Sequence, residues 1–276
     1  MSDLIVLFSA DLLFSSKVEA VARNADFEIV TIDNPAHFGE ESEYTRPGEP
    51  VDGGRLTKLT HFLTEEQPAL LIFELGNDTF PTKRWISVLK SSPATRRLPI
   101  LAYSPHVKKQ AMADATDAGA NKVVTRGEMA MKGGQLMKEL AKSADTAAIN
   151  AWCAQPLPDA ARASIDLFNA GEFYEAHHAL EALWMEDKGA ARDFYRAILQ
   201  VAVAYYQIGR GNYRGGVKMF LRVRQWLAPL PDVCRGVDLA QLREDTEAAF
   251  ERLTELGAER VEEFGGDFQP IKLVES

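Results

Sequence analysis

One helical segment of the sequence places an imidazole and a carboxylate where a core-facing stripe is expected. Phe173, His177, Leu180 and Trp184 recur at the spacing that brings side chains onto one face of a helix, and Glu181 follows His177 by one turn. Burying either polar group without a partner costs roughly 2 kcal/mol or more. The pattern therefore predicts that the two groups hydrogen-bond to each other, bind a metal or a ligand, or take part in catalysis.

His177 and Glu181 are the candidate catalytic residues, because a carboxylate on one ring nitrogen fixes the tautomer of a histidine and raises its basicity. The sequence shows no nucleophile to accompany them. The pair supplies only two ligands, whereas a zinc site takes at least three and a di-iron bundle needs several Glu and His residues on four helices. We therefore expect no metal and no cofactor.

A third polar residue, Gln200, lies in the segment Ala197–Ile208, which is apolar nearly all round and predicts a helix buried on most sides. A buried amide must find its hydrogen bonds inside the protein. The simplest arrangement sets Gln200 beside His177 and Glu181. Three interpretations of this cluster stay open: a structural network, a pocket for a small molecule or anion, and a metal or catalytic centre.

The first half of the chain alternates short apolar runs with helical patterns, which predicts parallel strands joined by crossover helices. The expected strands are Leu4–Phe8, Phe27–Ile32, Ala69–Phe73, Pro99–Tyr103 and Lys122–Thr125. The expected helices are Ser15–Asn24, Gly54–Glu65, Thr82–Lys90, Val107–Ala118 and Glu128–Ala144, with a long loop over Asp33–Gly54. The pattern indicates an α/β domain with a five-stranded doubly wound sheet.

Helical periods dominate the second half, which predicts an all-α bundle. The expected helices are Pro158–Asn169, Glu172–Glu186, Ala190–Ile208, Tyr213–Ala228 and Leu239–Leu256. A tail beginning at Phe268 alternates enough to lie extended, and Trp152 stands where it could pin the junction. We therefore expect two domains, residues 1–144 and 145–276.

Composition excludes several classes of partner. The net charge of -9 disfavours nucleic acid, because nucleic-acid binders usually display a basic surface. No window approaches the roughly 18 uninterrupted apolar residues of a membrane helix. Cys153 and Cys234 lack metal-ligand spacing, and the sequence from Met1 shows no signal peptide. These features predict a cytoplasmic protein with reduced cysteines.

The order of elements in the first half, with the stretches Pro99–Ser104 and Ala118–Gly127, resembles the receiver domain of bacterial response regulators. The resemblance implies a flavodoxin-like fold and a phosphorylation site at one edge of the sheet. In that family an acidic pair holds Mg²⁺, an aspartate accepts phosphate, and a Ser/Thr and a Lys respond to the new charge. The corresponding positions here are Ser9, Ala10 and Asp11 for the acids, Glu74 for the phosphoacceptor, and Ser104 and Arg126.

These exchanges imply that phosphotransfer is lost. Glu74 stands one methylene further out than aspartate and lacks the cation that would neutralise an incoming phosphoryl group. Glu74 and Arg126 are expected to form a fixed ion pair that mimics one signalling state; the alternative is a solvated pair of no regulatory meaning. The resemblance also implies a homodimer through Val107–Ala118 and Glu128–Ala144.

The second half resembles the helical family called domain of unknown function 309, over about residues 160–257. The resemblance lies in a helix with His-x-x-x-Glu-x-x-Trp and in a later Gln-bearing apolar helix that ends in Gly-Asn. It implies a set of ligand-binding candidates, namely His177, Glu181, Trp184, Gln200 and Asn212. His178 departs from the family, which often carries glutamate there.

The sequence as a whole predicts a regulatory or signalling interaction protein that works without phosphorylation. It would combine a pseudo-receiver with a helical domain that senses a small ligand or contacts a protein partner. The alternative is an enzyme or metalloprotein centred on His177 and Glu181.

Overall fold

The computed structural model describes residues 3–40, 54–105, 108–142 and 144–274. These residues form two compact units, one before residue 143 and one after it, and each is described by itself. Most of the expected loop Asp33–Gly54, and Val107 at the start of one expected helix, lie outside the described residues.

The first unit is built on a five-stranded parallel sheet with the strand order β2-β1-β3-β4-β5. Its strands are β1 (Leu4–Phe8), β2 (Glu28–Ile32), β3 (Leu70–Glu74), β4 (Ile100–Ser104) and β5 (Lys122–Thr125). The α/β fold class predicted from the alternating pattern is confirmed, because all four strand pairings are parallel and β1 pairs with both β2 and β3.

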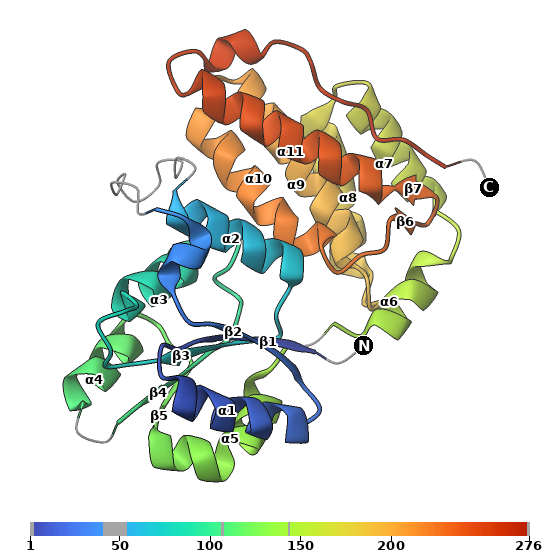
Figure 1. The fold of residues 1–276 in the computed structure, drawn as a ribbon. Helices are drawn as coiled ribbons and strands as arrows, with labels where there is room; N and C mark the ends of the chain where they lie inside the picture. The colour runs from blue at the N-terminus through green and yellow to red at the C-terminus, as the bar shows by residue number, and fades with distance from the viewer. Residues whose placement is uncertain (1–2, 41–53, 106–107, 143, 275–276) are drawn as a thin grey trace. The chain divides into compact units, whose positions relative to one another are not determined.

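Helices cover both faces of this sheet (Figure 1). They are α1 (Leu12–Asn24), α2 (Arg55–Glu66), α3 (Thr82–Ser91), α4 (Lys109–Asp117) and α5 (Arg126–Leu140), with a short 3-10 helix at Pro35–Phe38. Alternate residues of a strand point to opposite faces. Val6 and Phe73 therefore pack with α2, α3 and α4, whereas Leu7 and Ile72 pack with α1 and α5.

Two helices begin earlier than expected because their caps lie at the carboxyl ends of strands. The Asp11 carboxylate accepts a hydrogen bond from the backbone N–H of Phe14 and starts α1 at Leu12. Thr125 and Glu128 form a capping box that starts α5 at Arg126. Both starts bring side chains to one edge of the sheet, where the candidate site lies.

The second unit is an all-α bundle, as predicted. Its helices are α6 (Thr146–Cys153), α7 (Asp159–Asn169), α8 (Phe173–Glu186), α9 (Asp193–Gly209), α10 (Tyr213–Leu227) and α11 (Leu239–Leu256). The central helix α9 lies between α8 and α10 and is buried along most of its length (Figure 1). The sequence pattern did not predict α6 or the small hairpin of β6 (Val233–Cys234) and β7 (Val237–Asp238), since each hairpin strand has only two residues.

The C-terminal segment lies extended against the bundle. The side chain of Asn169 donates to the backbone oxygen of Ile271 and accepts from its nitrogen, at 3.0 and 2.7 Å. Leu273 forms an antiparallel bridge with Val237 of β7. The ring of Phe268 packs between Phe173 and Tyr205. The segment therefore completes the core of the second unit.

The expectation of reduced cysteines is wrong. Cys153 at the end of α6 and Cys234 in β6 form a disulfide, with their Cα atoms 4.4 Å apart. The pairing was hidden because 81 residues separate the two cysteines and because both elements that carry them escaped prediction. Within the described chain, no helix has the length and hydrophobicity needed to cross a bilayer.

Candidate functional site

Glu74, the last residue of β3, is the centre of the candidate site in the first unit. Its side chain is only 2% exposed, and its Oε2 atom accepts four hydrogen bonds. The donors are the hydroxyl of Ser9 at 2.9 Å, the backbone nitrogens of Ala10 and Asp11 at 3.2 Å each, and the amide of Asn77 at 3.0 Å. Ala10 and Asp11 donate through their backbones, because the turn after β1 aims both N–H groups at the end of β3.

Arg126 supplies the cation for this carboxylate. One guanidinium nitrogen pairs with Oε1 of Glu74 and lies 2.8 Å from Oδ2 of Asp11. The predicted ion pair between Glu74 and Arg126 is therefore present. It is not the solvated alternative, because Glu74 is buried and only 32% of the Arg126 side chain is exposed. The guanidinium also lies over the ring of Phe14, 5.0 Å from its centroid.

Asp11 is the acidic residue that remains near the first strand, and it has two structural tasks. It accepts from the backbone N–H of Phe14 at 3.1 Å, and it shares the Arg126 cation with Glu74. The hydrogen bond from Phe14, more than the charge of Arg126, lowers the pKa of Asp11 below its ordinary value. The carboxylate is therefore a helix cap and a second anion for Arg126.

A chain of hydroxyl groups leads to Glu74 from the interior. The hydroxyls of Tyr103 and Ser15 donate to Oγ of Ser9, at 3.2 and 2.8 Å, and Ser9 donates to Glu74. Burial raises the pKa of Tyr103. The sequence reasoning missed Ser15, Tyr103 and Asn77, although Asn77 follows Glu74 by three residues and Tyr103 directly precedes a predicted site residue.

Ser104 does not join this network. Its side chain is fully buried, and among the described residues its Oγ atom finds no hydrogen-bond partner. The receiver pattern predicted six site positions, and the structure leaves Ser104 apart from the others. The other five come together at one carboxylate, and they are Ser9, Ala10, Asp11, Glu74 and Arg126.

This arrangement leaves Glu74 little capacity for chemistry. A carboxylate offers about four acceptor positions on its two oxygens. Five protein groups already donate to these two oxygens, four to Oε2 and one, Arg126, to Oε1. A metal ion or a phosphoryl group would have to displace Arg126 first, and no group of three or more potential metal ligands is found in the part of the chain that the structure describes.

The helical unit places His177 and Glu181 differently from the expectation. The buried positions of α8 are Phe173, Ala176 and Leu180, so His177 and Glu181 lie at the flank of this stripe and are half-buried. A spacing of three or four residues fits either the centre or the flank of a helical stripe, and the sequence pattern does not separate them.

Burial still affects His177. It lowers the pKa of His177 below the ordinary value of 6.5, while the carboxylate of Glu181 acts in the opposite direction. The unfolded chain therefore binds a proton at His177 at a higher pH than the folded chain. Stability is lost as the pH falls below 6.5 towards the folded pKa, and the loss stops once both states are protonated.

We expect His177→Gln to remove this part of the pH dependence. The measurement is the melting temperature of wild type and variant between about pH 8 and pH 5, where only the difference between the two curves reports on His177. His178→Gln changes an exposed imidazole on the same helix and serves as the control. Parallel curves for wild type and His177→Gln would contradict the burial of this imidazole.

Gln200 has a partner other than the expected one. It is 8% exposed, and its amide oxygen accepts from the indole N–H of Trp226 on α10, at 3.1 Å. The indole of Trp184 donates to Asp193 at 3.2 Å. Both tryptophans contact Arg196, whose guanidinium lies 4.7 Å from the ring of Trp184 and 3.9 Å from that of Trp226. Gln200 and Trp184 thus join α8, α9 and α10 to one another.

Asn212 is the cap of a helix. Its side-chain oxygen accepts from the backbone N–H of Gly215 at the start of α10, and its amide donates to Gln207 at 2.7 Å. Gly211 before it adopts the left-handed conformation, with φ of 70°, which favours glycine. The Gly-Asn signature therefore positions the turn between α9 and α10.

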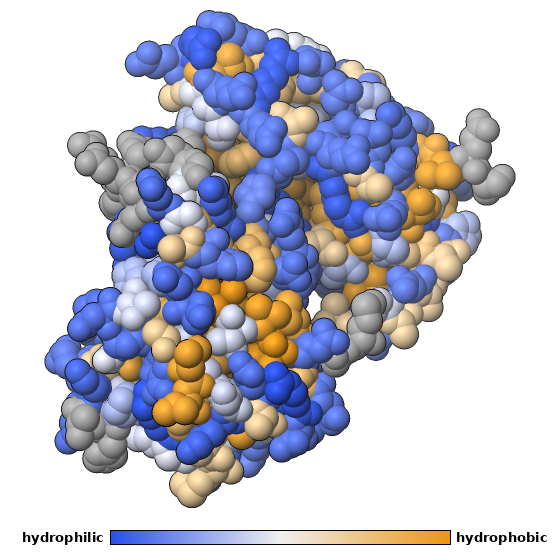
Figure 2. Space-filling view, viewed as in Figure 1, coloured by the Kyte–Doolittle hydropathy of each residue, from blue (hydrophilic) through white to orange (hydrophobic). Residues whose placement is uncertain are grey.

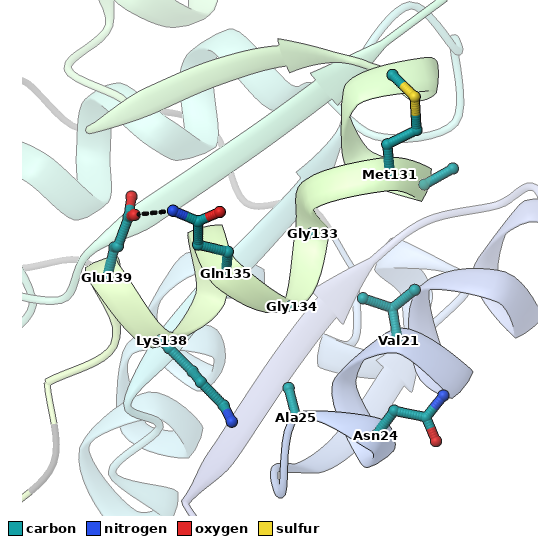
Figure 3. Close-up of a pocket in the computed structure, with 10 residues that line it drawn as sticks. Val21, Asn24, Ala25, Met131, Gly133, Gly134, Gln135, Lys138 and Glu139 are labelled. Atoms are coloured by element: carbon teal, nitrogen blue, oxygen red, sulfur yellow. Dashed lines mark hydrogen bonds between the residues drawn. The ribbon is translucent and has the colours of Figure 1, made fainter.

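A shallow groove of about 600 Å³ lies between α1 and α5 (Figure 3). Its floor is formed where Gly133 and Gly134 let α5 approach Val21 and Ala25 of α1; a Cβ atom on Gly133 would lie 3.1 Å from Val21. Met131 and Lys138 line its sides. The groove is open and does not include Glu74.

Comparison with known proteins agrees with both resemblances. The family model "Domain of unknown function (DUF309)" matches residues 161–219, a shorter stretch than expected, which contains most of α7, all of α8 and α9, and the start of α10. An uncharacterized protein of Aquifex aeolicus (strain VF5) is 31% identical over 77 residues, which are 28% of this chain and 23% of that protein. The match thus spans about a quarter of the relative.

Solved structures similar to the first half are receiver domains. A CheY-like protein (tadZ) from Pseudomonas aeruginosa PAO1 is 19% identical, with 52% of this chain and 96% of that chain covered and a TM-score of 0.39. The phosphorylated cyanobacterial phytochrome response regulator RcpA is 15% identical, with 51% and 94% covered and a TM-score of 0.37. A receiver domain from Rhodospirillum rubrum is 16% identical, with 51% and 99% covered and a TM-score of 0.37.

Proposed function

We propose that this chain is a regulatory interaction protein whose receiver-like unit is held in one state by the Glu74–Arg126 pair and is not switched by phosphorylation. The observation that carries the proposal is the engagement of both oxygens of the Glu74 carboxylate, Oε1 by Arg126 and Oε2 by four further donors. A phosphoacceptor needs a free oxygen for attack and a cation that can follow the transferred charge. Here Arg126 already neutralises the carboxylate.

The surface near this site supports a role in binding rather than in chemistry. Leu12 and Leu13 follow Asp11 at the start of α1 and are 65% and 86% exposed, and Met131 on α5 is 76% exposed. Figure 2 shows hydrophobic side chains at the surface of this unit. Adjacent exposed apolar residues such as Leu12 and Leu13 mark contact sites more often than isolated ones do. In the proposal, α5 contributes to a homodimer interface. The fixed ion pair between Glu74 and Arg126 holds the first turn of α5 in place.

The helical unit contributes a second surface. His177 and Glu181 offer one imidazole and one carboxylate at the flank of α8, whereas Trp184, Gln200 and Asn212 are engaged in holding the bundle. A small ligand of this unit would therefore meet His177 and Glu181. Its stabilisation of the fold would then be weaker in His177→Gln than in wild type.

The experiment is treatment of the full-length protein with acetyl phosphate, followed by intact mass and sedimentation. We expect no gain of a phosphoryl group and an unchanged sedimentation coefficient, because both oxygens of Glu74 already accept from protein donors. The matched variant carries Glu74→Asp and Arg126→Lys, which shortens the acid and replaces the planar cation by a point charge. A stable phosphoryl adduct on residues 3–142 of the wild type would overturn the proposal.

A further inference from the structure

We infer that the Cys153–Cys234 disulfide is a reversible redox site that determines how firmly α6 is held on the helical unit. The bond joins the last residue of α6 to the last residue of β6. The chain enters the second unit through α6. Reduction of this single bond therefore affects the segment that connects the two units in sequence.

The order of α6 depends on its contacts with the rest of the unit. The helix has eight residues, and an isolated helix of this length is not stable in water. Only Ile149, Trp152 and Cys153 are buried, and all three lie on its second half or its middle. The disulfide is the one covalent bond among these contacts. Without it, α6 is held on the unit only by noncovalent packing.

Trp152 occupies a site shaped to receive it. The guanidinium of Arg235 lies over its ring at 3.6 Å, and Phe194 and Tyr195 contact it with ring centroids 5.8 and 5.6 Å away. A Cβ atom on Gly189 would lie 2.3 Å from the indole nitrogen, so the ring packs directly on glycine backbone. These contacts let α6 dock again after it has opened.

Arg235 ties the hairpin to the same helix. Its backbone N–H donates to the carbonyl oxygen of Cys153 at 2.6 Å, and its guanidinium donates to Tyr195 and to Gln155 at 3.2 and 3.1 Å. Arg235 and Gly236 connect β6 to β7 with φ of 52° and 76°, the positive values that a two-residue hairpin turn requires. The hairpin thus presents Cys234 to Cys153 in a defined geometry.

The chemistry is thiol–disulfide exchange with a low-molecular-weight thiol of the glutathione class. Both cysteines are buried, with 5% and 0% of the residue exposed, so exchange takes place when α6 opens locally. A glutathione thiolate then attacks Sγ of Cys153 and expels the thiolate of Cys234. A second glutathione thiolate attacks the glutathione sulfur of the mixed disulfide and releases Cys153. Two glutathione molecules lose two electrons and leave as glutathione disulfide, and the two cysteines become thiols. Oxidation by glutathione disulfide is the reverse.

Reduction changes the length of the connection between the two units. With α6 docked, the connection runs from the end of α5 at Leu140 to the start of α6 at Thr146. With α6 undocked, it extends to the start of α7 at Asp159. The disulfide therefore couples the redox environment to the length of the segment that connects the two units in sequence.

The test is hydrogen exchange of the full-length protein equilibrated with reduced or oxidised glutathione, with thiol alkylation and intact mass as the readout of the redox state. We expect reduction to add two alkylation sites, to raise exchange in α6 by roughly tenfold or more, and to leave α9 unchanged. The Cys153→Ser/Cys234→Ser variant should reproduce the reduced pattern under both conditions. Trp152→Ala should raise exchange in α6 even when the disulfide is intact.

Three outcomes would overturn the inference. The first is a protein that stays a dithiol at every glutathione ratio. The second is equal exchange of α6 in the two redox states. The third is a simultaneous rise in exchange of α9, which would make the disulfide a staple of the whole bundle.

Discussion

Arg126→Met is expected to lower the unfolding free energy of the first unit by about 3 kcal/mol, because it leaves the Glu74 carboxylate buried without its cation. This loss is at the lower end of what breaking a buried ion pair costs. The reason is that about a third of the Arg126 side chain is exposed and four other donors still reach Glu74. Asp11 loses the same partner at 2.8 Å. The free energy can be read in the full-length protein from hydrogen exchange of the core amides of β3 and β4.

The chain offers a matched control for this substitution. Arg23 pairs with Glu19 on the exposed side of α1, with 63% of its side chain exposed, so Arg23→Met should change stability by less than about 1 kcal/mol. A second comparison uses Glu74→Gln combined with Arg126→Met, which removes both charges and should cost less than the sum of the single changes. If Arg126→Met proves no more destabilising than Arg23→Met, the pair does not hold the site.

Trp226→Ala is expected to destabilise the helical unit by about 3–5 kcal/mol. The substitution removes a buried indole, takes the hydrogen bond from the buried amide of Gln200, and removes one of the two rings that contact Arg196. All three losses fall on the packing between α9 and α10. Denaturant unfolding followed by far-ultraviolet circular dichroism, together with exchange of α9 amides, measures the effect.

The Trp226→Phe variant separates the hydrogen bond from the ring. It keeps an aromatic ring but leaves Gln200 unsatisfied, which costs about 1–3 kcal/mol. Adding Gln200→Leu removes the unsatisfied amide and should restore much of that loss. Failure of the second substitution to restore stability would show that Gln200 has a role beyond pairing with Trp226, such as contact with a ligand.

The parts of the fold that follow from periodicity were predictable, and the parts that depend on short elements were not. The run Leu4–Phe8 and residues 70–73 are apolar throughout, as expected for strands buried on both faces, and they fix the sheet. The strands β6 and β7 have two residues each and leave no periodic signal. The disulfide depends on that hairpin, so it could not be foreseen.

The two candidate sites differ in predictability for a physical reason. The carboxyl ends of parallel strands meet at one edge of a sheet, so the predicted topology and the resemblance to receiver domains together placed Glu74 and Arg126 in one site. On α8, the side on which His177 lies depends on how α9 packs against it, which a helical period does not specify. The hydroxyl chain through Tyr103 and Ser15 depends on packing in the same way.

The extended segment held by Asn169 and Val237 has a consequence for biosynthesis. Ile271 and Phe268 fill positions in the core of the second unit, and they are translated after α11. While the ribosome is still adding them, the first unit already has all five of its strands and can fold. The bundle lacks these two side chains until translation passes Ile271, so its completion follows synthesis of that segment.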